Sequence, residues 1–168
     1  VSTSSNVRHS VSPRCENLLV LTLEIKFNLS NSKMAAVWSG KKYKLDSSKN
    51  FDEYMTKLGV GMVTRKMGNT ISPTIELIEE EGGKFKLKTT STFKNSEIQF
   101  TIGEEFDEET IDGRKVKSVI TRDGNKFHQI QKGDKLETTI DREFTPTEMT
   151  AIMKVGDIVC TRVYKVVE

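Results

Sequence analysis

The chain has 168 residues, of which 35% are hydrophobic and 30% charged, and its formal net charge at pH 7 is +2. This length suits one domain with a modest core or a lined cavity, and the scattered balance of acids and bases argues against nucleic-acid binding. The two cysteines, Cys15 and Cys160, are too few for a disulfide framework and indicate a reducing compartment, so the cytosol is the expected location.

Residues 1–33 are rich in Ser and Asn and differ from everything that follows. Their apolar stretch, residues 18–23, is too short to span a bilayer, and residues 28–33 offer no small-residue cleavage site of a signal peptide. Met34 resembles a natural start. We therefore expect residues 1–33 to be an unstructured leader or upstream extension and residues 34–168 to be the domain, with secretion as the less favoured alternative.

The domain begins with a predicted strand at residues 38–45, which residues 46–50 interrupt. A helix is expected next, because Asn50 and Glu53 have the spacing of a capping box and apolar side chains then recur on one face. Gly59 supplies the C-terminal stop of this helix.

A second short helix is predicted from Met62, Val63 and Met67, and residues 68–69 end it. The two helices form a helix-turn-helix, but DNA binding is disfavoured because no stripe of Arg, Asn and Gln accompanies them. The Met-rich face is interpreted instead as a packing surface.

After Pro73 the apolar period changes to two, which predicts short strands near residues 75–77, 84–88, 98–102 and 116–120. Turn signals separate the runs at intervals of about 8 to 12 residues, as in a sandwich or barrel. With the first and last strands, about ten strands are expected.

Residues 89–92 and 127–131 are polar on both strand faces, which favours a wet cavity over a dry core, with edge strands as the alternative. The acidic run at residues 104–109 is interpreted as a solvated edge strand that prevents aggregation, in preference to a cation site.

The last three predicted strands, residues 138–144, 149–155 and 158–166, carry two arginines among apolar neighbours. If they pair antiparallel, Arg142 and Arg162 lie on the outer two strands, about 10 Å apart, with a gap that fits a carboxylate. Tyr164 shares the face of Arg162. Like charges repel in an empty barrel, so replacing either arginine is expected to leave the stability of the ligand-free form level or raised.

Features of enzymes are missing from this pattern. No His, Cys or Asp spacing fits a metal site, and no phosphate loop, dinucleotide fingerprint or serine elbow occurs. We therefore expect no catalysis, cofactor or metal.

Several motifs together resemble the signature of the intracellular fatty-acid-binding proteins, closest to the heart or muscle type. The likeness covers residues 34–168. It is carried by KKYKL (41–45), NFDEYM (50–55), LGVG (58–61), STFKNSE (91–97), GEEFD (103–107), RKVKS (114–118), RE (142–143) and CTRVY (160–164).

The resemblance implies an all-β fold, a ten-stranded antiparallel β-barrel or β-clam of two near-orthogonal five-stranded sheets, with a helix-turn-helix lid between the first two strands. It also implies that Arg142, Arg162 and Tyr164 hold a ligand carboxylate. Portal and cavity positions are implied for Phe51, Met55, Pro73, Phe93 and Met153.

The function expected on this basis is non-enzymatic transport of a long-chain fatty acid through the cytosol by a monomer. A carrier of retinoic acid or another hydrophobic carboxylate is the alternative, and a lipid-modifying enzyme and a secreted interaction protein are less favoured. The resemblance also implies that Lys57, Arg65, Lys66 and Lys94 can attract anionic membranes transiently during transfer, and a merely solvated role is the favoured alternative for each single lysine. Ala151 stands where the family commonly has a bulkier aliphatic residue, which alters the cavity lining.

Overall fold

The computed structural model describes residues 35–167, so the expected leader at residues 1–33 lies outside the described part of the chain. Ten antiparallel strands pair in the order β4-β3-β2-β1-β10-β9-β8-β7-β6-β5 and form one nearly closed barrel. The strands are β1 Lys42–Lys49, β2 Thr74–Glu79, β3 Lys84–Thr90, β4 Ser96–Thr101, β5 Glu105–Glu109, β6 Lys115–Asp123, β7 Lys126–Lys132, β8 Glu137–Phe144, β9 Glu148–Val155 and β10 Ile158–Val166.

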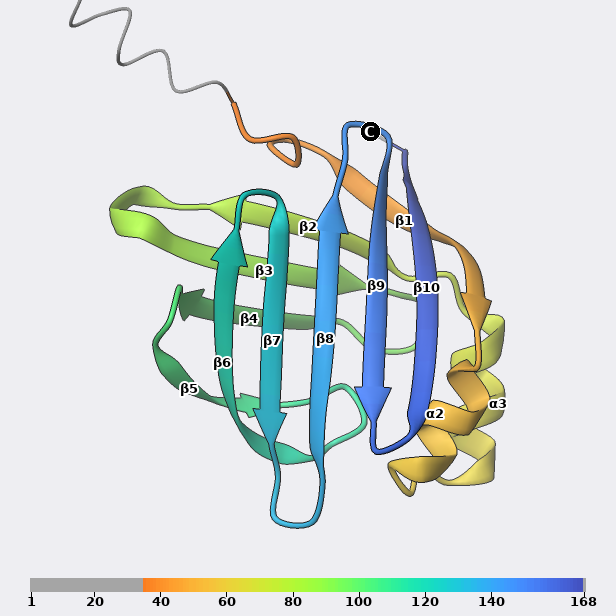
Figure 1. Cartoon of the computed structure of the whole chain (residues 1–168). Coiled ribbons are helices and arrows are strands. Elements are labelled where there is room, and N and C mark those ends of the chain that lie inside the picture. Colours follow the sequence, from red (N-terminus) through yellow and green to blue (C-terminus); the bar gives the residue numbers. More distant parts are fainter. Residues whose placement is uncertain (1–34, 168) are drawn as a thin grey trace, which may run out of the picture. The chain divides into compact units, whose positions relative to one another are not determined.

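Figure 1 shows β6 to β10 as one layer that crosses β2, β3 and β4 at a steep angle. The helices α2 Phe51–Lys57 and α3 Met62–Thr70 connect β1 to β2, and a short 3-10 helix, η1 Glu81–Gly83, connects β2 to β3. The predicted all-β clam with two helices between its first two strands is therefore confirmed. We call α2 and α3 together the lid.

The first strand differs from its prediction. Trp38 lies in a turn at residues 37–40, whereas β1 starts at Lys42 and continues through residues 46–49, where the sequence indicated a break. Pairing with β10 supplies backbone hydrogen bonds to this polar stretch, and a bulge in the middle of β1 adjusts the register. Long-range pairing therefore overrides the local turn signal.

Helix α2 begins directly after Asn50 as predicted, but its cap differs from the prediction. Asn50 has left-handed backbone geometry, with φ of 58°, and its side chain makes no cap hydrogen bond. Instead, its Nδ2 donates to the carbonyl oxygen of Val159 at 3.0 Å. The predicted capping box is therefore wrong, because Asn50 ties the helix to the neighbouring strand. The predicted stop is confirmed: Gly59 has φ of +80° and its N–H donates to the carbonyl oxygen of Thr56.

The two lid helices differ in burial. Helix α2 buries Tyr54 and Met55, whereas α3 buries no residue and extends slightly past its predicted end. The interpretation of the α3 apolar residues as a packing surface is wrong, because Met62, Val63 and Met67 are 61%, 71% and 41% exposed. Helix α3 approaches α2 closely at Gly68, where an added Cβ would lie only 3.2 Å from the Met55 sulfur.

Strands β4 and β5 end the pairing order, so backbone hydrogen bonds do not close the barrel between them. The rings of Phe100 and Phe106 stack across this gap with centroids 6.0 Å apart. The acidic run lies on β5, an edge strand as predicted, with Glu105, Asp107 and Glu109 exposed. The polar residues 89–90 lie in β3 and 127–131 in β7, and both strands have a neighbour on each side, so the edge-strand alternative is wrong; residues 91–92 lie in the turn after β3.

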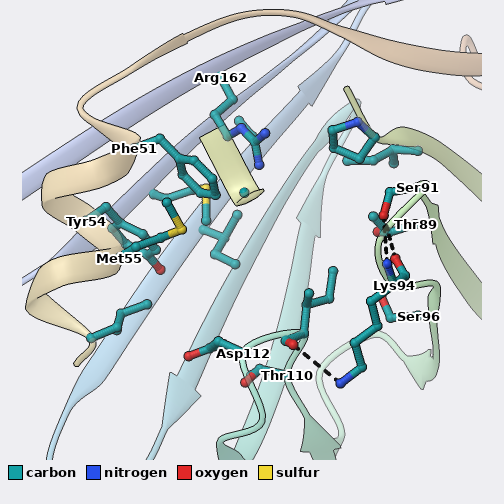
Figure 2. A pocket seen from close by; sticks show the side chains of 18 of the residues that line it. Phe51, Tyr54, Met55, Thr89, Ser91, Lys94, Ser96, Thr110, Asp112 and Arg162 are labelled. Atoms are coloured by element: carbon teal, nitrogen blue, oxygen red, sulfur yellow. Dashed lines mark hydrogen bonds between the residues drawn. The ribbon is translucent and has the colours of Figure 1, made fainter. Parts of the chain in front are cut away.

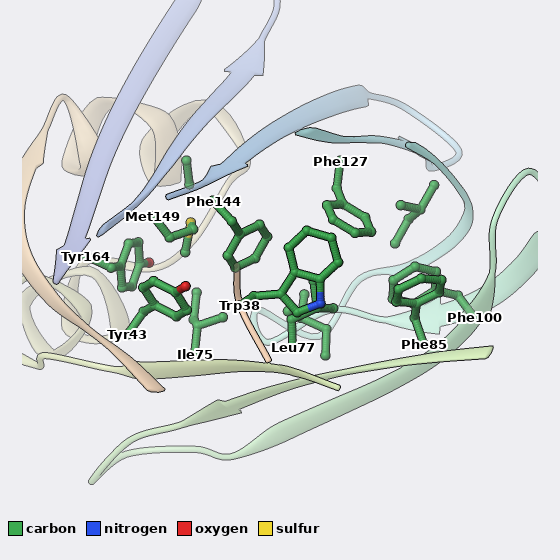
Figure 3. Packing of buried hydrophobic residues seen from close by; sticks show 13 residues of the cluster. Trp38, Tyr43, Ile75, Leu77, Phe85, Phe100, Phe127, Phe144, Met149 and Tyr164 are labelled. Carbon is green, nitrogen blue, oxygen red and sulfur yellow. The ribbon is translucent and has the colours of Figure 1, made fainter. Parts of the chain in front are cut away.

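A cluster of rings fills the barrel away from the lid (Figure 3). Its members, which we call the aromatic cluster, are Trp38, Tyr43, Phe85, Phe100, Phe127 and Phe144. Trp38 and Phe127 meet edge to face at 5.2 Å, and the guanidinium carbon of Arg122 lies 4.7 Å from the Trp38 ring centroid. Trp38 thus plugs the barrel from its turn.

No helix within residues 35–167 has both the length and the apolar character needed to cross a membrane.

Candidate functional site

The last three strands bring two arginines to the same position along the sheet. Arg142 on β8 and Arg162 on β10 both pair with Ala151 on β9. The predicted arrangement of three adjacent antiparallel strands is confirmed, and two strand spacings, about 10 Å, separate the arginine backbones. Ala151 is buried and its methyl group is too small to fill the space between two guanidinium arms.

These strands form one wall of a cavity under the lid (Figure 2). In the figure, Phe51, Tyr54 and Met55 of α2 face Thr89 and Ser91 across the cavity. The structure brings every side chain predicted at the site into the lining of this one cavity: Phe51, Met55, Pro73, Phe93, Arg142, Met153, Arg162 and Tyr164.

Arg162 is a buried cation, only 7% exposed. Its guanidinium carbon lies 4.0 Å from the ring centroid of Phe51 and 5.7 Å from that of Tyr164. Its Nε is buried and has no hydrogen-bond partner within residues 35–167, and no carboxylate of that part of the chain forms an ion pair with it. Since burying an unpaired charge is costly, Arg162 is suited to bind an anion. Phe51, which was predicted at the portal, therefore also packs against the Arg162 guanidinium.

Arg142 is bound into the protein instead. Its Nη1 donates to the side-chain oxygen of Gln129 at 2.7 Å. Burial lowers the pKa of the Arg142 guanidinium below its usual value, and the nearby Glu108 carboxylate is the first of the groups that oppose this effect. The two arginines thus share a level of the sheet but have different surroundings.

Glu108 on β5 is the site residue that sequence reasoning missed. Its carboxylate accepts hydrogen bonds from Ser118 Oγ at 2.5 Å, Gln129 Nε2 at 2.7 Å and Gln131 Nε2 at 2.9 Å. The signal was alternation: Phe106 points inward, so the residue two positions later shares that face. The run was interpreted as acidic throughout, which concealed its single inward carboxylate.

Tyr164 adds a hydroxyl on the face of Arg162. It is 3% exposed, and burial raises the pKa of its hydroxyl, an effect that Arg162 and then Arg142 oppose. The hydroxyl therefore stays protonated at neutral pH and can donate a hydrogen bond.

The turn between β5 and β6 forms another part of the cavity lining, where Asp112 and Arg114 pair with each other. Arg114 Nε donates to Asp112 Oδ2 at 2.6 Å. Burial acts to raise the pKa of Asp112, but hydrogen bonds from Arg114 and Thr110 outweigh it and leave the pKa lowered. This pair balances its own charge.

Cys160 is the buried thiol beside the site, with no exposed surface. Burial raises its pKa to about 11, although Arg162 acts in the opposite direction. The thiol is therefore protonated at neutral pH and is a poor nucleophile.

Comparison with known proteins gives consistent matches over the described barrel. Residues 39–167 match the model of the lipocalin / cytosolic fatty-acid binding protein family. The muscle fatty acid-binding protein of Schistocerca gregaria is 53% identical over 133 residues, which cover 79% of this chain and 98% of that protein.

Solved structures show the same similarity. A fatty acid-binding protein from brain tissue of Drosophila melanogaster is 62% identical with a TM-score of 0.72, covering 76% of this chain and 98% of that one. A Schistosoma mansoni fatty acid binding protein in complex with arachidonic acid is 44% identical with a TM-score of 0.75, covering 79% and 97%.

Proposed function

Because the chain belongs to the lipocalin / cytosolic fatty-acid binding protein family, we propose that it is a non-enzymatic carrier of one long-chain fatty acid. The ligand lies inside the barrel, with its carboxylate at Arg162 and Tyr164 and its tail along the apolar lining. The observation that carries this proposal is the buried, unpaired guanidinium of Arg162 at the wall of a covered cavity.

A carboxylate supplies what Arg162 lacks. It offers two oxygens to the planar guanidinium and accepts a further hydrogen bond from the Tyr164 hydroxyl. Arg142 stays bound to Gln129 through Nη1 and has other N–H groups to direct at the ligand. Arg142 therefore contributes less than Arg162.

The tail needs apolar surface, which the lid and the opposite strands supply. Met55 and Leu58 of the lid region and Ile75, Leu87 and Met153 of the barrel line the cavity. Burial of methylene groups contributes about 0.8 kcal/mol each, so a long chain gains more than the head group alone provides.

Three ligands test the proposal: oleic acid, oleyl alcohol and retinoic acid, each titrated by displacement of a fluorescent fatty acid. Oleic acid is expected to bind tightly at one site, and oleyl alcohol at least about tenfold more weakly, because hydrogen bonds to charged groups contribute about 1.5–3 kcal/mol. Tight binding of retinoic acid without binding of oleic acid would favour the retinoid alternative. Binding of neither acid would refute the proposal.

The non-enzymatic part is tested separately. The Cys160 thiol is protonated, so incubation with a fatty ester or an acyl thioester is expected to release no product above the uncatalysed rate. Saturable turnover would contradict this part while leaving carriage intact.

Delivery to membranes is proposed to use the outer face of α3. Met62, Val63 and Met67 are exposed there, and Lys66 lies exposed among them, which suits an anionic lipid surface. Transfer of a fluorescent fatty acid to vesicles with phosphatidylserine should be slower for Lys66→Glu than for the native chain. Lys84→Glu, at the β2–β3 turn away from α3, is the matched control (Figure 1); equal slowing by both would contradict a specific role of the lid.

A further inference from the structure

The cavity contains a carboxylate that fatty-acid carriage does not require. Glu108 lies on the inward face of β5 and lines the same cavity as Arg142 and Arg162. A negative charge there repels an anionic ligand, so its presence calls for a role other than binding the head group.

In the hydrogen bonds around Glu108, the neighbouring side chains donate and the Glu108 carboxylate accepts. Arg142 Nη1 donates to Gln129 Oε1 at 2.7 Å, and Thr138 Oγ1 donates to Gln131 Oε1 at 2.8 Å. A guanidinium can only donate, so the Gln129 amide must present its oxygen to Arg142 and its nitrogen to Glu108.

The Gln131 amide also directs its nitrogen at Glu108, so Glu108 has three donors, the third being the Ser118 hydroxyl. An ionised carboxylate accepts all three hydrogen bonds. An amide or a protonated acid at this position would place its own N–H or O–H donor opposite one of the three donors. The arrangement holds a negative charge at this position and connects it to Arg142 through one amide.

The charged residues that line the cavity nearly balance. The cations are Lys94, Arg114, Arg142 and Arg162, and the anions are Glu108, Glu109 and Asp112. Asp112 and Arg114 pair with each other, and Glu108 offsets Arg142 through Gln129. One positive charge remains in excess, and the unpaired buried cation is Arg162.

We propose that Glu108 sets the charge of the ligand: by offsetting Arg142, it makes the cavity complementary to a lipid with one negative charge and rejects a lipid with two. This inference rests on the proposed function. Among the cavity's cations in the described residues, Lys94 is exposed and Arg114 and Arg142 are already offset, so a second charge on the head group would find no further buried cation. It would also be repelled by Glu108 in a poorly screened interior.

Hexadecyl sulfate and hexadecyl phosphate test this directly, because they share a tail and a tetrahedral head. At about pH 8.5 the sulfate carries one negative charge and the phosphate close to two, since the second pKa of a phosphate monoester is about 6. Displacement of a fluorescent fatty acid from the full chain is expected to show the sulfate binding at least about tenfold more tightly than the phosphate.

Glu108→Gln and Glu108→Ala are each expected to reduce this preference to about threefold or less, chiefly by tightening phosphate binding. Glu105→Gln, the matched control, removes a carboxylate from the outward face of the same strand and should keep the native preference. Thermal unfolding of each variant checks that it is folded.

Several outcomes overturn the inference. If a folded Glu108 variant binds fatty acid and still prefers the sulfate as strongly as the native chain does, another residue makes the selection. Loss of the sulfate preference in Glu105→Gln would lead to the same conclusion. If the native chain itself binds both detergents equally, no charge selection exists, whether or not the variants fold. Failure of the native chain to bind any fatty acid would instead refute the proposed function.

Discussion

The aromatic cluster and the lid end of the barrel differ in how their inward side chains are satisfied. In the cluster, rings contact rings: the ring centroid of Phe127 lies 5.2 Å from that of Trp38 and 5.6 Å from that of Phe85. At the lid end, Arg162 is buried without a hydrogen-bond partner for its Nε within the described chain. Within the described residues the cluster leaves only a neutral donor unpaired, Trp38 Nε1, whereas the lid end leaves a charged group unpaired. Because an unpaired buried charge is much the more costly of the two, stability and binding are expected to separate along the barrel.

Phe127→Ala should produce the largest change and tests that separation at the aromatic cluster. Phe127 is buried and does not line the cavity, so its removal should lower the free energy of unfolding by about 3–5 kcal/mol. Denaturant unfolding of the ligand-free form measures this change. Oleic acid affinity of the folded variant should stay close to native, and an affinity loss of the same size would show that the two regions are not independent.

Arg162→Gln tests the lid end and should have the opposite profile. Oleic acid affinity is expected to fall by about 2–5 kcal/mol, because one side of a buried charge pair is removed. Calorimetric titration measures it. The midpoint of unfolding of the ligand-free form should stay level or rise, since the variant no longer buries an unpaired charge.

Arg162→Lys is the matched control, because it keeps the positive charge but loses the planar set of guanidinium donors. Its oleic acid affinity should lie between those of the native chain and Arg162→Gln. A large drop in the stability of the ligand-free Arg162→Gln protein would show instead that the arginine is a structural member of the core.

Arg142→Gln sharpens the comparison within the site itself. From sequence alone, this substitution was expected to leave the ligand-free form as stable or more so. The structure changes that expectation, because Gln129 would lose its charged donor and Glu108 its offsetting charge. Unfolding stability should fall by about 1–3 kcal/mol, and oleic acid affinity should fall less than in Arg162→Gln. A stabilised ligand-free variant would show that the Glu108 network does not need Arg142.

Phe93→Ala should have the smallest effect on affinity, below about 1 kcal/mol, because Phe93 is 42% exposed and lies in the turn between β3 and β4. It should raise the association and dissociation rates of a fluorescent fatty acid together, as expected for a side chain that gates entry. Stopped-flow mixing separates the two rates. An increase in dissociation alone, with an affinity loss near that of Arg162→Gln, would identify Phe93 as an anchor.

The sequence sufficed for the arginine wall because its information is local. Alternation places Arg142, Arg162 and Tyr164 on defined strand faces, and short turns at residues 145–147 and 156–157 leave only antiparallel neighbours for these strands. The resemblance to the family added the role of the two helices as a lid and the arrangement of the ten strands as an antiparallel clam.

Glu108 could be placed inside the barrel by the same alternation, but its partners could not be named. Ser118, Gln129 and Gln131 reach it from β6 and β7, and the register of β5 on β6 and of β6 on β7 decides which side chains lie beside it. Register depends on the whole curved sheet, because shifting a pair by one residue exchanges its two faces.

The tertiary structure alone decided three further features. Trp38 plugs the barrel from a turn instead of starting a strand, Asn50 bonds to Val159 instead of capping its helix, and α3 exposes the apolar face that its sequence suggested it would bury. Local patterns state which side chains share a face, whereas contacts between distant segments determine whether that face meets protein, cavity or solvent.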